Sequence, residues 1–96
     1  MSALTTPASS TVAQIPPADR IETLRSEVDA CDAELIELVQ RRLAISREIG
    51  ALRAASGGTR LSLSRESQVL TRFRAALGPE GASLAMMLLR QGRGRL

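Results

Sequence analysis

A long heptad pattern dominates this sequence, and one charged residue interrupts it. Ten positions spaced three and four apart form an unbroken seam, in which the seventh position is Arg42 and the other nine are apolar: Ile21, Leu24, Val28, Cys31, Leu35, Leu38, Ile45, Ile49 and Leu52. This spacing predicts one long helix whose apolar edge is covered by another chain. Because burying an unpaired guanidinium costs several kcal/mol, Arg42 needs either a protein carboxylate or a bound anion. The first case describes a coiled coil and the second an enzyme.

The chain is short enough to form one domain at most. Residues 1–18 are rich in Ser, Thr, Ala and Pro and carry no charged side chain, so we expect a disordered tail before a helical domain over residues 19–96. No segment has the basic start and apolar run of a signal peptide or the length of a membrane span. These features predict a cytoplasmic protein without a membrane partner. Cys31 is the single cysteine and lies on the seam, which excludes a disulfide framework and a zinc site.

Several reactive side chains are missing from the sequence. It contains no His, Trp, Tyr or Lys, so the usual general base, metal ligand and Schiff-base amine are not available. A hydrolytic triad is therefore excluded. All 13 basic residues are arginine, whose planar guanidinium binds carboxylates and phosphates bidentately and stays protonated.

Charge is distributed unevenly along the chain. Residues 19–40 hold seven acidic residues and two arginines, whereas residues 41–96 hold eleven arginines and three acidic residues. Such blocks are typical of a nucleic-acid-binding surface, or of a dimer in which the acidic half of one protomer lies beside the basic half of the other. Phe73 is the only aromatic residue, which weakens the nucleic-acid interpretation because single-strand binding relies on aromatic stacking.

Prolines and glycines divide the chain into three predicted helices. Pro16 and Pro17 precede Asp19, a candidate N-cap, and no further proline occurs before Pro79, so the first helix should cover residues 18–55. At 1.5 Å per residue this helix would be about 55 Å long, more than a monomer of this size could cover. We therefore expect an all-α fold, with one very long and two shorter helices, that forms an intertwined homodimer.

The two shorter helices should follow a turn at residues 56–59. The second should be capped by Ser62 or Ser64, end at Gly78-Pro79 and present an apolar face of Val69, Leu70, Phe73, Ala76 and Leu77. The third should cover residues 80–90 and bury Leu84, Leu88, Leu89, Met86 and Met87, the two methionines filling gaps in the core. Residues 91–96 contain too much glycine to be predicted as helix.

Arginines on the first helix and at the start of the second could form one anion site. Arg42 and Arg53 are eleven residues apart, almost three turns, so they share one face about 16 Å apart along the axis. Gly50 lies between them, and a glycine inside a helix indicates a close approach, either by a packed helix or by a ligand. Arg65 and Glu66 open the second helix, whose N-terminus adds positive potential.

These residues resemble the all-helical (AroQ-type) chorismate mutases. The matching elements are Leu24-Arg25-Ser26-Glu27-Val28-Asp29, Asp32, Arg41-Arg42, Ile49-Gly50 with Arg53, and Arg65-Glu66. The similarity covers residues 21–96. The loop at residues 57–61 and the ending at residues 92–96 are similar to the short intracellular mutases of actinobacteria.

The resemblance implies an intertwined dimer that converts chorismate to prephenate by a Claisen rearrangement without metal or cofactor. By analogy, Arg42 and Arg25 of the other subunit bind the two carboxylates of the substrate. Arg53 donates to the ether oxygen, Glu66 accepts from the ring hydroxyl, and Arg65 lies close by. Catalysis would come from holding the dianion in its reactive conformation and stabilising charge on the ether oxygen.

The sequence departs from the family pattern at two places. Ser62 stands where the family has an aspartate at the substrate site, and Gly92 and Leu96 fall where relatives supply a serine and a glutamine from the third helix. An active site that is incomplete alone fits the resemblance to actinobacterial mutases, which implies activation in a complex with DAHP synthase.

Other functions remain open from the sequence. An isochorismate-pyruvate lyase or an aminodeoxychorismate mutase would use nearly the same arginines. A basic helical dimer that binds nucleic acid would fit the sequence pI of 10.9. A structural coiled coil would require Glu34 or Glu48 to pair with Arg42 across the dimer.

Overall fold

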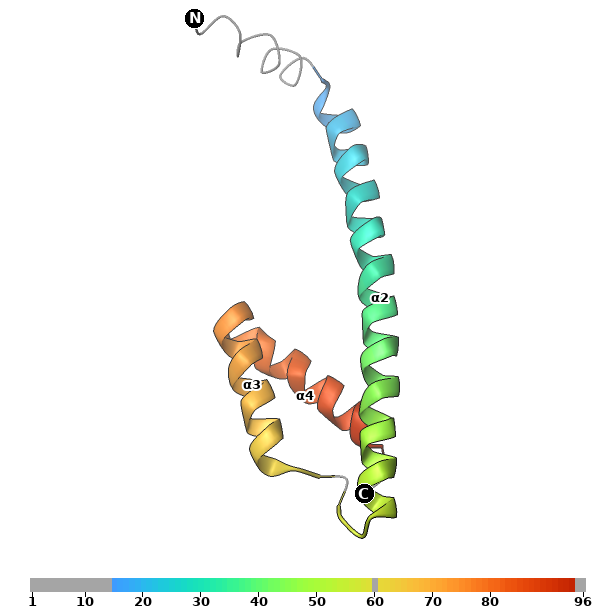
Figure 1. Ribbon diagram of the computed structural model, residues 1–96. Helices are drawn as coiled ribbons and strands as arrows, with labels where there is room; N and C mark the ends of the chain where they lie inside the picture. Colours follow the sequence, from blue (N-terminus) through green and yellow to red (C-terminus); the bar gives the residue numbers. More distant parts are fainter. Residues whose placement is uncertain (1–14, 60, 95–96) are drawn as a thin grey trace, which may run out of the picture. The chain divides into compact units, whose positions relative to one another are not determined.

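The computed structural model describes residues 15–59 and 61–94, and the regular structure within this part is helical. Three helices follow one another: α2 (Pro17–Ala55), α3 (Leu63–Leu77) and α4 (Pro79–Arg93) (Figure 1). The described residues contain no strand. The predicted all-α class, with one long and two shorter helices, is confirmed.

Helix α2 begins at a proline, which suits the first helical position because proline lacks the N–H that would have no partner there. The Arg20 N–H donates to the Pro16 carbonyl at 3.0 Å. Asp19 was predicted at the N-cap but lies in the first turn of the helix. There its negative charge interacts favourably with the positive end of the helix dipole. Residues 1–14 of the predicted disordered tail lie outside the described residues, and Pro17 and Ala18 are already helical.

The chain divides into two units, one ending at Leu35 and the other spanning Ile36–Leu96. In the first unit, α2 is solvent-exposed along its described length, and Arg25 Nη1 lies 3.6 Å from Glu22 Oε1 in an exposed ion pair. The second unit holds the rest of α2 together with α3 and α4, and contains the buried residues.

Helices α3 and α4 form a tight hairpin with a small apolar core. Val69, Ala85 and Leu89 are buried, and Leu70 and Phe73 pack against them. The turn between the helices is Gly78, whose φ of 81° lies in the left-handed region that favours glycine. The predicted apolar face of α3 is correct for Val69, Leu70 and Phe73.

The predicted core of α4 needs correction at three positions. Leu84, Met86 and Met87 are exposed, the two methionines at 41% and 52%. Ala76 and Leu77, on the predicted apolar face of α3, are exposed in the single chain as well. The buried stripe of α4 contains the predicted Leu88 and Leu89. It also contains three small residues, Gly81, Ala85 and Gly92, which let α4 approach its neighbours closely. Met86 and Met87 fall outside this stripe, so they do not fill the core of the single chain.

Helix α4 is also longer than predicted, because it continues through Gly92 to Arg93. A Cβ on Gly92 would lie 2.5 Å from Ser46 Oγ, so the missing side chain lets the last turn of α4 lie against α2. The Gly94 N–H then caps the helix by donating to the Arg90 carbonyl at 3.3 Å. Leu96 lies outside the described residues.

The heptad seam of α2 is exposed in the single chain. Its eight large apolar members are between 42% and 64% exposed: Ile21, Leu24, Val28, Leu35, Leu38, Ile45, Ile49 and Leu52. Cys31 is exposed as well. Among the described residues, no helix has the length and apolar character needed to cross a membrane.

Candidate active site

A short loop brings the start of α3 back to the end of α2. Ser56 Oγ donates to the Leu52 carbonyl at 2.8 Å, and the Gly58 N–H donates to the Arg53 carbonyl at 2.8 Å, so α2 ends in a closed turn. Ser62 is then the N-cap position of α3, although its side chain makes no capping hydrogen bond. The Glu66 N–H donates to the Ser62 carbonyl at 3.0 Å, which begins the helix.

This arrangement creates a cavity of about 490 Å³ within the second unit, which we call the arginine cavity. Helix α2 contributes Arg42 and Arg53 with Gly50 between them. The start of α3 contributes Ser62, Arg65 and Glu66, and α4 contributes Leu89 and Arg93. The walls are completed by Ile45, Ser46, Ile49, Ser64 and Val69.

One carboxylate lies among the four arginines of this cavity, and it is paired with one of them. Arg93 Nε lies 3.3 Å from Glu66 Oε2, and both side chains are largely buried. The described residues contain one other ion pair, Arg25–Glu22, which lies in the first unit. Within the described part of the chain, Arg42, Arg53 and Arg65 therefore have no carboxylate partner, and the cavity keeps three uncompensated positive charges.

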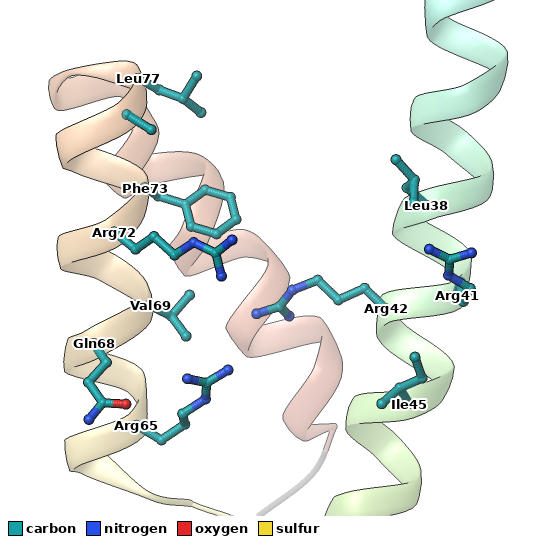
Figure 2. A pocket seen from close by; sticks show the side chains of 11 residues that line it. Leu38, Arg41, Arg42, Ile45, Arg65, Gln68, Val69, Arg72, Phe73 and Leu77 are labelled. Carbon is teal, nitrogen blue, oxygen red and sulfur yellow. The ribbon is translucent and has the colours of Figure 1, made fainter.

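A second hollow of about 730 Å³ adjoins the arginine cavity between α2 and α3, and we call it the apolar groove. Figure 2 shows Arg42 extending from α2 toward α3, with Val69 and Phe73 projecting from α3 on the opposite side. Arg41, Arg65 and Arg72 also line the groove. Its remaining lining residues are Leu38, Ile45, Gln68, Ala76 and Leu77. The groove thus combines apolar walls with positive charge.

The arginine cavity brings together five of the six site residues expected from the sequence: Arg42, Arg53, Ser62, Arg65 and Glu66. Arg42 and Ser62 are half-buried, whereas Arg53 and Arg65 are exposed in the single chain. Arg25 belongs to the first unit, where it pairs with Glu22. Gly50, expected to lie beside a helix or a ligand, is buried and lines the cavity.

Sequence reasoning missed Arg93 as a cavity residue. The glycines around it suggested that the third helix stops at Arg90, and outside a helix the direction of a side chain cannot be assigned. The available signal was the spacing of Arg93 four residues after Leu89, which places both on one face if the helix continues. No group of three or more His, Cys, Asp or Glu side chains that could hold a metal occurs among the described residues.

Comparisons with known proteins point to one family. The family model of type II chorismate mutases matches residues 24–88. An intracellular chorismate mutase of Mycolicibacterium smegmatis is 58% identical over 76 residues, covering 79% of this chain and 73% of that protein. The intracellular chorismate mutase of Mycobacterium tuberculosis is 55% identical over 80 residues, covering 83% of this chain and 75% of that protein.

A similar solved structure also contains a chorismate mutase. It is a non-covalent complex of DAHP synthase and chorismate mutase from Corynebacterium glutamicum with a bound transition state analogue. The matched chain aligns with a TM-score of 0.79 and 45% identity, over 84% of this chain and 99% of that one. The fold is thus that of an all-helical isomerase. The chain belongs to the type II chorismate mutase family, and its function is that of a chorismate mutase.

Proposed function

We propose that the arginine cavity binds chorismate and converts it to prephenate. The observation that carries this proposal is the group of three arginines, Arg42, Arg53 and Arg65, that have no carboxylate partner among residues 15–59 and 61–94 and surround a cavity of about 490 Å³. A dianion would supply the missing negative charge. The rearrangement occurs within one molecule, so the protein has to fix the conformation of the substrate and stabilise the charge that develops.

The roles of the cavity residues are those that the resemblance to chorismate mutases implies, and they fit the chemistry of each side chain. Arg42 binds one carboxylate through charge-assisted hydrogen bonds, with Arg65 beside it. Arg53 donates to the ether oxygen, where negative charge grows in the transition state. Glu66 accepts a hydrogen bond from the ring hydroxyl. Ser62, half-buried at the start of α3, contributes a neutral hydroxyl at the margin of the cavity.

The second substrate carboxylate is bound by Arg25 of a second copy of the chain. The exposed apolar seam of α2 has to be buried against another apolar surface, and α2 of a second copy of the chain has the matching heptad pattern. The apolar groove, lined by Arg41, Arg42, Arg65 and Arg72, fits the acidic half of that second α2 in charge and in apolar character. The active unit is therefore an intertwined homodimer in which each site takes residues from both chains.

The protein acts in the cytoplasm, in phenylalanine and tyrosine biosynthesis, and forms an activating complex with DAHP synthase. Supporting this are relatives named as intracellular enzymes and a similar structure solved as a complex with DAHP synthase. Titrating the purified mutase with the DAHP synthase of the same organism should raise its kcat/KM. An unchanged kcat/KM at saturating synthase would contradict the proposed activation.

The substrate assignment can be tested by incubating the purified protein separately with chorismate, isochorismate and aminodeoxychorismate. We expect chorismate to be consumed with formation of prephenate, which is detected after its acid conversion to phenylpyruvate. Consumption of only isochorismate or aminodeoxychorismate would contradict the proposal. Arg42→Ala is the matched control, because it removes one of the three arginines of the proposed site and should reduce the reaction.

A further inference from the structure

The ion pair between Arg93 and Glu66 connects the last turn of α4 to the first turn of α3. The Nε–Oε2 distance is 3.3 Å, and the side chains are 20% and 16% exposed. The Arg25–Glu22 pair is longer, at 3.6 Å, and its side chains are 74% and 71% exposed. Because solvent screens the buried pair less, it restrains its two side chains more strongly than a surface pair does.

The position of Arg93 depends on the close approach of its neighbour to α2. Gly92 is buried, and a Cβ at this position would lie 2.5 Å from Ser46 Oγ and 2.9 Å from Ser46 Cβ. Only a residue without a side chain lets the last turn of α4 come this near to α2. Arg93 thereby reaches the arginine cavity from a third helix.

The charges in the cavity explain why Glu66 needs a dedicated partner. Glu66 lines the same cavity as Arg42, Arg53 and Arg65, which the substrate needs. A free Glu66 carboxylate could pair with one of these arginines and neutralise it. Arg93 Nε lies beside Oε2, and the second carboxylate oxygen, Oε1, can accept a hydrogen bond from the substrate.

We infer that Arg93 is a positioning residue for the isomerase reaction. It holds Glu66 so that Oε1 faces the substrate hydroxyl, and it prevents Glu66 from pairing with the arginines that bind the substrate. This inference rests on the role proposed above for Glu66 in the arginine cavity. Arg93 acts through Glu66 and makes no contact with the reacting atoms.

A double-mutant cycle on kcat/KM tests this inference. Arg93→Ala should lower kcat/KM about tenfold, with a higher KM and a lower kcat, since both the free arginines and the orientation of Glu66 are affected. Arg93→Lys should retain most of the activity because it keeps the positive charge. In a Glu66→Gln background, Arg93→Ala should have little further effect, because the residue it acts through is already changed.

Arg90→Ala is the matched control, since it removes an exposed arginine from the same last turns of α4 without touching the cavity. It should leave kcat/KM unchanged, and thermal unfolding of every variant identifies losses caused by unfolding. Equal effects of Arg93→Ala in both backgrounds, a gain in kcat/KM, or a loss with Arg93→Lys equal to that with Arg93→Ala would overturn the inference. A Glu66→Gln variant with full activity would instead contradict the proposed role of Glu66 itself.

Discussion

Arg53 lies near the end of α2, where it lines the arginine cavity without a carboxylate partner among the described residues. If it donates a hydrogen bond to the ether oxygen, this bond stabilises mainly the transition state, in which negative charge develops on that oxygen. Arg53→Ala should therefore lower kcat by about 10²–10³ and change KM little, as removal of an oxyanion-type donor does. Steady-state kinetics with chorismate measures both parameters.

Arg47→Ala is the control for this prediction. Arg47 is an exposed arginine of the same helix and does not line the cavity, so its removal should leave kcat unchanged. A large rise in KM with a normal kcat in Arg53→Ala would instead assign Arg53 to substrate binding.

Arg42 should respond differently, because the carboxylate that we propose it binds is present in the ground state and in the transition state alike. Arg42→Ala should weaken substrate binding by about 1.5–3 kcal/mol, seen mainly as a higher KM. The same kinetic assay, with Arg47→Ala as the reference, measures this change. An unaltered KM would show that the guanidinium does not contact the substrate.

Most of the candidate site could be predicted from the sequence, for a physical reason that is clear at Arg42. A charge on an apolar seam indicates a residue that needs a carboxylate partner or a bound anion, and helical periodicity then places Arg53 on the same face. Arg93 could not be found in this way. Its position depends on a packing contact between Gly92 and Ser46, which no local pattern contains.

At the scale of the helices, small residues control how α3 and α4 pack. A Cβ on Gly81 would meet the Phe73 carbonyl and the Leu77 side chain, so Gly81→Ala should lower the free energy of unfolding by about 1–3 kcal/mol through overpacking. Chemical denaturation measures this loss. Ser83→Ala, at an exposed position two residues later, should stay within about 0.5 kcal/mol of the wild type.

An equal or higher stability of Gly81→Ala would contradict the close contact, since alanine has the better helix propensity.

The sequence predicted the number of helices and most of their ends well, because proline and glycine act locally. It predicted the α4 core less well, since Gly81, Ala85 and Gly92 carry little hydrophobic signal. Met86 and Met87 carry a strong signal and yet lie on the exposed side.

At the scale of the whole molecule, the sequence predicts contacts that a single chain cannot make on its own. The seam of α2 is exposed along its length, and the apolar groove is positively charged where the other half of α2 is acidic. Both features are explained if two chains cover each other. Contact with a second chain stays a prediction from the sequence, and its register depends on side-chain packing between two copies.

Subunit complementation tests the central claim, which is that two chains supply arginines to one site. In a heterodimer of Arg25→Ala and Arg42→Ala chains, one site would lack both arginines and the other would keep both. At a substrate concentration far below the raised KM values, each variant alone should have little activity. After subunit exchange, an equimolar mixture should regain about a quarter of wild-type activity, because half of the dimers are heterodimers with one working site.

The matched control is a mixture of Arg42→Ala and Arg53→Ala chains. Both of these arginines come from the same chain in each site, so every heterodimer should have two defective sites and the mixture should gain nothing. Activity that rises only in the Arg25→Ala and Arg42→Ala mixture is the result we predict. Equal activity of that mixture before and after exchange would contradict a site shared between two chains.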